Sequence, residues 1–174
     1  MIFFVSDLHL SAQTPTLTRI FLDFLGSRAR AAEALYILGD LFEYWVGDDD
    51  LEDPANAAIA GALRELSDSG VELNIMRGNR DFLFGERFAA ATGARLLTDP
   101  HVLSLPAWQF VLSHGDMLCT DDAEYQAFRT QSRAAEWQTA FLAKQLAERR
   151  AIARALREQS EAGKHEKAQG NNAY

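Results

Sequence analysis

Mostly apolar runs and amphipathic stretches alternate along the first part of the chain. The runs at residues 2–5, 35–38 and 71–76 have the composition of buried strands in a parallel sheet. Between them, stretches that begin at Thr14-Pro15 and at Pro54 carry apolar residues at helical spacing, the second ending near Gly70. This alternation of strand and helix predicts an α/β fold whose first strands are parallel.

The pattern changes further along the chain. A short helix at residues 86–91 precedes two strands, 102–105 and 108–112, which a turn at Pro106 joins. From about residue 121 to 158 the sequence predicts continuous helix, whose scattered apolar positions indicate a helical pair or lid rather than a coiled coil. We therefore expect a core at residues 1–120, a helical lid at 121–167 and a disordered tail at 168–174.

The composition is that of an ordinary globular domain. With 174 residues, 48% of them apolar, the chain can bury a sizeable core. Its one cysteine, Cys119, excludes an internal disulfide framework and a zinc site built from several cysteines. No apolar run is long enough to span a bilayer and no secretory signal pattern opens the chain, so we expect a cytoplasmic protein that can still attach to a membrane surface.

The charge is unevenly distributed. Residues 1–128 carry 20 acidic and 8 basic side chains, whereas residues 129–174 carry 5 acidic and 9 basic ones. An acidic body argues against broad nucleic-acid binding, which needs a positive surface. The basic segment fits an anionic partner, such as a phosphate-bearing substrate or an acidic membrane face, and equally fits a solvated amphipathic helix.

Four polar clusters stand directly after apolar runs: Asp7-Leu8-His9, Gly39-Asp40, Gly78-Asn79-Arg80-Asp81 and His114-Gly115-Asp116. Strand ends that share one sheet edge converge in space, so residues far apart in sequence can meet there. Asp, His and Asn are oxygen and nitrogen ligands that hold hard or borderline divalent metals. The clusters therefore predict a two-metal hydrolytic centre, in which the metals activate a water and polarise a phosphoryl oxygen.

The spacing within the clusters suits metal binding. Asp7 and His9 are two residues apart, so along an extended strand they point the same way. Asp40 follows a glycine that permits a sharp turn, and its carboxylate can bridge two cations. Asn79 offers a neutral oxygen and His114 an imidazole. Taken singly, each cluster also fits an ordinary turn, an N-cap or a hydrogen-bonded histidine, but their joint position at successive strand ends favours the metal site.

The series of clusters resembles the calcineurin-like metallophosphoesterases. Within them the chain is similar to one family, the UDP-2,3-diacylglucosamine diphosphatases of the lipid A pathway. The segments that carry this resemblance are Ser6-Asp7-Leu8-His9-Leu10, Tyr36-Ile37-Leu38-Gly39-Asp40-Leu41-Phe42-Glu43, Trp45-x-Gly47-Asp48-Asp49, Gly78-Asn79-Arg80-Asp81-Phe82-Leu83 and His114-Gly115-Asp116-x-Leu118-Cys119-Thr120-Asp121-Asp122. The resemblance covers residues 1 to about 167 and implies a metallophosphoesterase-type β-sandwich flanked by helices, with a helical lid.

The resemblance also implies the metal ligands and the cofactor. It assigns Asp7 and His9 to a first metal, Asp40 to a bridging position, and Asn79 and His114 to a second metal. The family uses manganese, so two Mn²⁺ ions are expected per complete site. The catalytic set implied by the resemblance is Asp40, Asn79, Arg80 and His114.

The substrate implied is the lipid precursor UDP-2,3-diacylglucosamine. The reaction that the resemblance implies is attack by water on the UMP-side phosphorus, giving UMP and 2,3-diacylglucosamine 1-phosphate, and the location that it implies is peripheral, on the cytoplasmic face of the inner membrane. The positions that match substrate-contacting residues of the family are Asn79, Arg80, Asp122, Ser160 and Lys167, with Lys164 standing where the family commonly has Asn.

Arg80 carries information that does not depend on the resemblance. Many metallophosphoesterases have a histidine after the Asn, where it can protonate an alkoxide leaving group. Arginine cannot release a proton at working pH, but it pairs well with phosphate oxygens. Hydrolysis of a diphosphate expels a phosphate monoester, which needs little help to leave. Arg80 therefore favours a diphosphate substrate, and the alternative is a surface ion pair with Asp81.

The helical segment fits the same substrate. An amphipathic helical pair can hold acyl chains on its apolar side and phosphate on its basic side, or lie on an anionic membrane, which attracts each Lys or Arg by about 1 kcal/mol. Ordinary packing of helices on a core would give a similar sequence.

One expected motif is missing. Members of the family carry a Gly-His-x-His motif that gives one histidine to each metal, whereas the remaining histidines here, His101 and His165, stand in no such motif. We therefore expect a partial sequence that lacks its last strands, or a defective product, with little activity on its own. Another binuclear-metal phosphodiesterase or phosphatase, and a non-catalytic remnant, stay open as alternatives.

Overall fold

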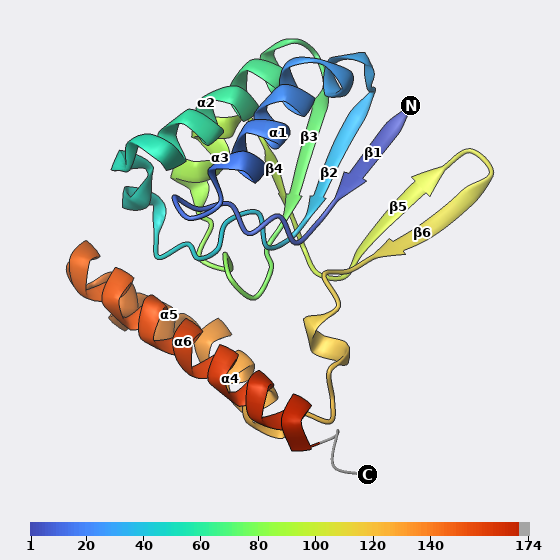
Figure 1. Ribbon diagram of the computed structural model, residues 1–174. Helices are drawn as coiled ribbons and strands as arrows, with labels where there is room; N and C mark the ends of the chain where they lie inside the picture. The colour runs from blue at the N-terminus through green and yellow to red at the C-terminus, as the bar shows by residue number, and fades with distance from the viewer. Residues whose placement is uncertain (171–174) are drawn as a thin grey trace.

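The computed structural model describes the backbone of residues 1–170 and the side chains of residues 1–158 and 160 (Figure 1). A four-stranded parallel sheet forms the centre, in the order β1 (Ile2–Val5), β2 (Ala34–Leu38), β3 (Glu72–Met76) and β4 (Arg95–Leu97). Three helices connect or follow these strands: α1 (Pro15–Gly26), α2 (Pro54–Asp68) and α3 (Glu86–Thr92). The α/β fold expected from the sequence is thus confirmed.

The three helices cover one face of the sheet (Figure 1). Pro54 occupies the first turn of α2, where its missing N–H is not needed, and the carboxylate of Asp53 accepts the N–H of Ala55 at 2.9 Å as an N-cap. The inward face of α2 then buries Ile59 and Leu63 against the sheet. Short 3₁₀ turns at Arg28–Ala31 and Asp48–Glu52 complete this layer.

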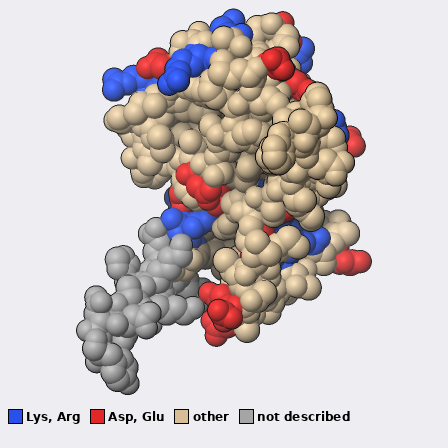
Figure 2. All heavy atoms as spheres, turned by 90° about the vertical axis from the view of Figure 1, so that its right-hand side faces the viewer, with Lys and Arg blue, Asp and Glu red and all other residues tan. Residues whose placement is uncertain are grey.

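An antiparallel hairpin packs on part of the other face of the sheet and diverges from it toward the turn (Figure 1). It consists of β5 (His101–Leu105) and β6 (Trp108–Leu112), which confirms the two strands and the connecting turn expected from the sequence. Leu103 and Leu112 are buried against Tyr36 of the main sheet. The side chain of Trp108 is exposed. The face of the molecule seen in Figure 2, above the helical segment, carries few charged side chains. Strand β4 was not expected from the sequence, because three residues are too few to show a period-two pattern.

The helical segment consists of three helices rather than one continuous helix. They are α4 (Ala123–Arg133), α5 (Ala135–Leu142) and α6 (Leu146–Gly170), preceded by a 3₁₀ turn at Asp116–Leu118. The helix is interrupted at Ala134, between α4 and α5, where the backbone is extended with ψ of 137°. No Gly or Pro marks this break, so the sequence alone favoured continuity. Residues 171–174 of the expected tail lie outside the described residues.

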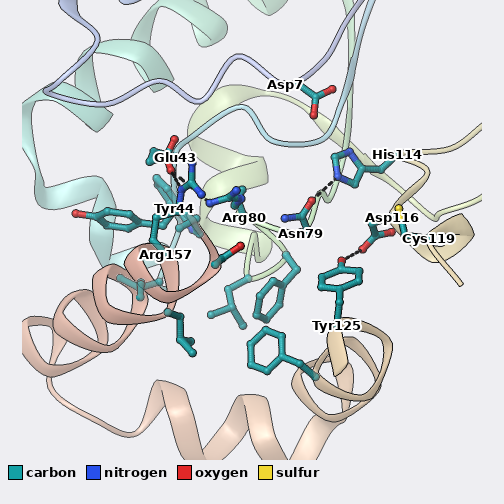
Figure 3. A pocket seen from close by; sticks show the side chains of 18 of the residues that line it. Asp7, Glu43, Tyr44, Asn79, Arg80, His114, Asp116, Cys119, Tyr125 and Arg157 are labelled. Carbon is teal, nitrogen blue, oxygen red and sulfur yellow. Dashed lines mark hydrogen bonds and ion pairs between the residues drawn. The ribbon is translucent and has the colours of Figure 1, made fainter. Parts of the chain in front are cut away.

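A cavity of about 590 Å³ lies between the helical segment and the carboxyl ends of the parallel strands (Figure 3). The strands point toward this cavity, so the loops that follow β1, β2 and β3 form its floor. Within the described part of the chain, no helix is both long and apolar enough to cross a membrane.

Candidate metal centre and ligand cavity

The loops that follow β1 and β2 hold three of the expected metal ligands in an uncommon backbone conformation. Asp7, His9 and Asp40 have φ values of 54°, 48° and 54°, in the left-handed region that residues other than Gly seldom adopt. The backbone is held there by hydrogen bonds from the N–H of Asp7 to the Gly39 carbonyl and from the N–H of His9 to the Asp40 carbonyl. Such strain is characteristic of functional loops.

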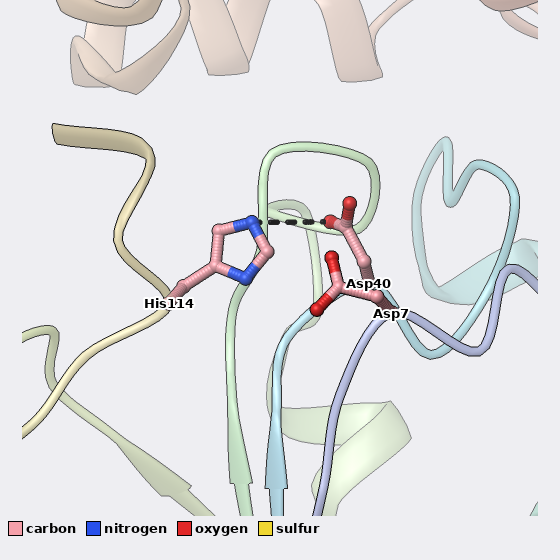
Figure 4. A group of neighbouring side chains, drawn as sticks. All are labelled: Asp7, Asp40 and His114. Atoms are coloured by element: carbon pink, nitrogen blue, oxygen red, sulfur yellow. Dashed lines mark ion pairs between the residues drawn. The ribbon is translucent and has the colours of Figure 1, made fainter. Parts of the chain in front are cut away.

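These loops bring a cluster of metal-ligating atoms together. Atoms of Asp7, Asp40 and His114 all lie within 4.8 Å of one another (Figure 4). His114 Nε2 is 3.6 Å from Asp40 Oδ1, and His9 Nε2 is 3.8 Å from Asp40 Oδ2 and 4.0 Å from Asp7 Oδ1. Asp40 is therefore central, as a bridging carboxylate would be.

Asn79 joins the cluster through His114. The His114 Nδ1 lies 2.9 Å from the Leu38 carbonyl, so this nitrogen carries the proton and Nε2 presents a lone pair. The Asn79 amide lies 2.9 Å from Nε2, and without an ion its nitrogen donates to Nε2 while its oxygen accepts from Arg80 Nε. If the Asn79 amide is turned the other way, its oxygen and His114 Nε2 are two acceptors 2.9 Å apart. Two acceptors this close repel each other unless a cation lies between them. The donor set therefore fits a divalent metal.

Buried carboxylates set the electrostatics of the cluster. Burial raises the pKa of Asp40, although the Arg80 N–H and the neighbouring His114 and His9 act against this rise. Asp81 lies beneath it, wholly buried, and burial together with the Asp40 charge raises the pKa of Asp81 to about 7. A cation beside Asp40 would offset the burial cost, since opposite charge favours the ionised form.

Asp81 has a structural role rather than pairing with Arg80. Its carboxylate accepts backbone N–H groups, including those of Leu41 at 2.7 Å and Gly78 at 2.8 Å, and so joins the loops after β2 and β3. Gly78 packs so closely on Asp40 that an added Cβ would overlap the Asp40 carboxylate. The surface ion pair considered for Arg80 and Asp81 is therefore wrong.

Arg80 faces the cavity beside the cluster (Figure 3). Its Nη1 lies 3.4 Å from Glu43 Oε1 and its Nε 4.0 Å from Asp40 Oδ2. The side chain is only 13% exposed, so its charge is held at a fixed place next to the candidate metal ligands. A guanidinium there can bind a phosphate oxygen.

The cavity is polar beside the Asp40 cluster and largely apolar elsewhere, where the helices and the loops after β2 and β3 line it. Its apolar lining includes Val46, Phe82, Leu83, Phe128, Trp137, Phe141 and Leu156. Trp137 stacks on Phe141 with ring centroids 4.8 Å apart, which gives this wall a fixed shape. A cavity of this kind suits an amphiphilic ligand, with its charged part at the cluster and its apolar part among the helices.

The expected substrate residues are placed to different degrees. Asp122 and Ser160 both line the cavity, and Asp122 also caps α4 by accepting the Tyr125 N–H at 3.1 Å. The side chains of Lys164 and Lys167 lie outside the described residues.

The structure adds residues that the sequence analysis did not assign. Asp116 is buried, and its Oδ2 accepts from Tyr125 Oη at 2.6 Å and from Arg129 Nε at 2.9 Å, which ties α4 to the His114 loop. Although burial acts against it, these hydrogen bonds lower the pKa of Asp116. A signal existed in the sequence, since Asp116 belongs to the His114-Gly115-Asp116 cluster, but its partners stand on a helix and could not be identified.

Helix α6 is attached to the core by arginines. Arg149 is 3% exposed and donates to the carboxylate of Asp49, and Arg150 Nε donates to buried Asp50 at 2.8 Å. Arg157, one of the residues that line the cavity, pairs with Glu43. The basic character of the segment, considered above as a site for an anionic partner, thus serves in part to hold the segment onto the acidic body (Figure 2).

Together these observations define the class: an α/β protein with a candidate metal centre at the carboxyl ends of its parallel strands, opening into a ligand cavity. Its relatives specify the family. The chain is 55% identical to UDP-2,3-diacylglucosamine hydrolase of Chromobacterium violaceum over 95% of its own length and 69% of the relative's. It is 51% identical to the protein of that name from Stenotrophomonas maltophilia, over 98% and 68% of the two chains.

The chain therefore belongs to the UDP-2,3-diacylglucosamine hydrolase family, which confirms the family expected from the motifs. It spans about two thirds of the length of these relatives. No protein-family model matches it. Among solved structures it shows a slight likeness to the nuclease MPE of Pseudomonas putida, with a TM-score of 0.44 and 24% identity over 58% of this chain and 49% of that one. That likeness is too low to support an argument.

Proposed function

We propose that the chain hydrolyses the diphosphate bond of UDP-2,3-diacylglucosamine, giving UMP and 2,3-diacylglucosamine 1-phosphate. The observation that carries the proposal is the position of Arg80, whose guanidinium lies between the Asp40 cluster and the cavity. The name of the relatives, UDP-2,3-diacylglucosamine hydrolase, supports the same substrate.

The residues divide the work between binding and chemistry. Arg80 pairs with the phosphate oxygens and stabilises the charge that builds up on them, and it leaves protonation of the leaving phosphate to water. Asn79 contacts the same phosphate, and His114 keeps its Nε2 lone pair directed at the site because Nδ1 is bonded to the Leu38 carbonyl. Asp122 and Ser160, which line the cavity, contact the rest of the substrate, together with Lys164 and Lys167.

Five residues would hold two Mn²⁺ ions: Asp7 and His9 one ion, Asn79 and His114 the other, with Asp40 bridging. The ions would supply a water activated as hydroxide and a polarised phosphoryl oxygen. The separations of 2.9–4.0 Å among the ligand atoms support this assignment, as does the burial of Asp40, which a cation would offset.

The helical lid at residues 121–167 would bind the lipid part of the substrate. Its apolar wall, built around Trp137 and Phe141, offers a surface for acyl chains. The protein would work in the cytoplasm on the inner-membrane surface, where its lipid substrate lies. An acidic body, with 20 acidic and 8 basic side chains in residues 1–128, argues against a nucleic-acid substrate.

The test is UMP release from UDP-2,3-diacylglucosamine by the purified 174-residue chain, with and without Mn²⁺. We expect manganese-dependent release, and in ¹⁸O-labelled water the label should enter UMP. Asp40→Asn should lower the rate by about tenfold or more. Label in the lipid phosphate would refute attack at the UMP-side phosphorus, and metal-independent release would refute the metal centre.

A substrate panel separates the alternatives. Faster cleavage of p-nitrophenyl phosphate esters than of the UDP lipid would indicate another metallophosphoesterase. Absence of Mn²⁺ binding in calorimetry would indicate a non-catalytic remnant. Because the sequence carries no Gly-His-x-His motif, we expect its turnover to be well below that of the longer Chromobacterium violaceum relative. Equal turnover would show that catalysis does not need this motif.

A further inference from the structure

Glu43 stands where three functional elements meet. It lies three residues after Asp40, and its N–H donates to the Leu10 carbonyl at 3.1 Å, which fixes the backbone at this point. Its carboxylate is 22% exposed and faces two arginines and a histidine that come from three different parts of the chain. Figure 3 shows the two arginines, Arg80 and Arg157, beside Glu43.

One carboxylate oxygen faces His9. Glu43 Oε2 is 3.6 Å from His9 Nδ1, while the other ring nitrogen, Nε2, faces Asp7 and Asp40. The Nδ1 atom is buried and makes no hydrogen bond within the described part of the chain. A metal-ligating histidine ordinarily donates its second ring N–H to a carboxylate or carbonyl, which fixes both the tautomer and the ring orientation. Glu43 is the carboxylate positioned to accept that proton.

The other oxygen faces the arginines. Glu43 Oε1 pairs with Arg157 Nε of helix α6, and Arg80 Nη1 lies 3.4 Å from the same oxygen. Arg157 stands 114 residues beyond Glu43 in the chain, so this pair joins the helical lid to the loop that carries Asp40. The same carboxylate thus contacts both the lid and a candidate metal ligand.

We infer that Glu43 is a positioning residue that couples the docking of helix α6 to metal binding at His9. With α6 docked, Arg157 holds the carboxylate in the place where Oε2 can orient the His9 ring. When α6 moves away, the carboxylate loses a partner and His9 loses its fixed orientation. Because coupling between two sites is reciprocal, metal binding must in turn favour the docked helix. The inference rests on the proposed role of His9 as a metal ligand and does not depend on the substrate.

The coupling can be measured without catalysis. Calorimetry gives the Mn²⁺ affinity of the chain, and hydrogen exchange of residues 146–158 with and without Mn²⁺ reports the docking of α6. Glu43→Gln removes the charge at nearly constant shape, and Arg157→Met removes the lid partner. Glu65→Gln and Arg154→Met are the matched controls, since Glu65 is an exposed surface residue and Arg154 lies on α6 away from Glu43.

We expect Glu43→Gln to weaken Mn²⁺ binding by about tenfold or more, in the range typical of lost outer ligand partners. Arg157→Met should weaken it by about fivefold, although Arg157 is not a metal ligand. In the double variant the loss should equal that of Glu43→Gln alone, since both changes break the same connection. Mn²⁺ should slow exchange of α6 in the wild-type chain and in both controls, but not in Glu43→Gln.

Three results would overturn the inference: unchanged Mn²⁺ affinity in Glu43→Gln, additive losses in the double variant, or exchange of α6 that does not respond to Mn²⁺ in the wild-type chain. If Glu43→Gln fails to fold, Glu43→Asp replaces it, because aspartate keeps the charge at a shorter reach. Glu43→Asp should weaken Mn²⁺ binding, and adding Arg157→Met should not weaken it further; unchanged affinity or an additional loss would overturn the inference. These readouts separate the inference from the proposed function, because a chain that binds Mn²⁺ but releases no UMP refutes only the latter.

Discussion

Replacing Arg149 with methionine should loosen helix α6 from the core. The Arg149 side chain is 4% exposed, and its guanidinium donates to the Asp49 carboxylate and to the Val46 carbonyl. Its Nε also donates to the Lys144 carbonyl at 3.0 Å, two residues before the helix begins. Methionine keeps an apolar stem of similar length but supplies no donor, so all of these hydrogen bonds are lost together.

The magnitude follows from what each partner can do afterwards. Val46 is buried, and loss of a charged donor to its carbonyl costs about 1.5–3 kcal/mol. The Asp49 side chain is 38% exposed, so water can replace the guanidinium and the ion pair is worth only about 0.5–1 kcal/mol. Burial of the Arg149 guanidinium carries a desolvation cost, and the methionine variant no longer has this cost, which offsets part of the two losses. We therefore expect a loss of about 2 kcal/mol in docking of α6, below the roughly 3–5 kcal/mol of a fully buried pair.

Hydrogen exchange is the suitable assay, because the loss falls on one helix. A loss of about 2 kcal/mol should raise the exchange rate of α6 amides by roughly 30-fold, with little change in the amides of β2 and β3. Arg149→Lys should give an intermediate increase, since lysine keeps the charge but lacks the planar fork that reaches several acceptors.

Two results would refute this reasoning. Exchange of α6 in Arg149→Met that equals the wild-type rate would show that the buried arginine does not hold the helix. An equal increase in Arg154→Met, which removes an arginine from the exposed side of α6, would show that the effect comes from helix charge rather than from the contacts with Asp49 and Val46.

Three further predictions concern the site and the core. Gly78→Ala should weaken Mn²⁺ binding by about tenfold in calorimetry, because an added Cβ would displace the Asp40 carboxylate. Asp116→Asn should destabilise the chain by about 1–3 kcal/mol in urea at pH 7, and the difference from wild type should shrink as the pH falls below about 4, since a lowered pKa gives stability that acid removes. Phe88→Ala should cost about 3–5 kcal/mol in urea, because Phe88 is fully buried and stacks on Phe84 with centroids 4.0 Å apart.

Each of these has a contradicting outcome. Gly26→Ala is the control for Gly78, because an added Cβ there meets nothing within 4 Å, and equal effects of the two changes would refute the steric argument. For Asp116, a difference from wild type that grows toward low pH would have the wrong sign. For Phe88, a loss below about 1 kcal/mol would show that the aromatic cluster repacks around the cavity.

The sheet and the loops of the site were accessible from the sequence because their signals are local. Apolar runs at residues 2–5, 35–38 and 71–76 form strands within a residue of the expected bounds. The residues that follow them, among them Asp7, Asp40 and Asn79, converge because parallel strands end at one edge of the sheet. Their joint role in holding metal stays a prediction.

Other features depend on contacts that no local pattern encodes. No Gly or Pro marks the break between helices at Ala134, so tertiary packing decides where these helices end. Asp122 both lines the cavity and caps α4, and tertiary packing likewise decides which way this helix faces. The strand β4 is too short for periodicity to detect.

The class of fold, the family and the residues that gather at the sheet edge could be predicted from the sequence, since alternation of strand and helix and motif spacing are properties of neighbouring residues. The way in which the lid is held could be seen only in the folded chain. The pairs of Arg149 with Asp49 and of Arg157 with Glu43 join residues at least 100 positions apart, and such pairing depends on where a helix packs rather than on its composition. For the same reason the sequence did not distinguish Glu43 from other acidic residues. In the structure, Glu43 contacts both the lid and His9.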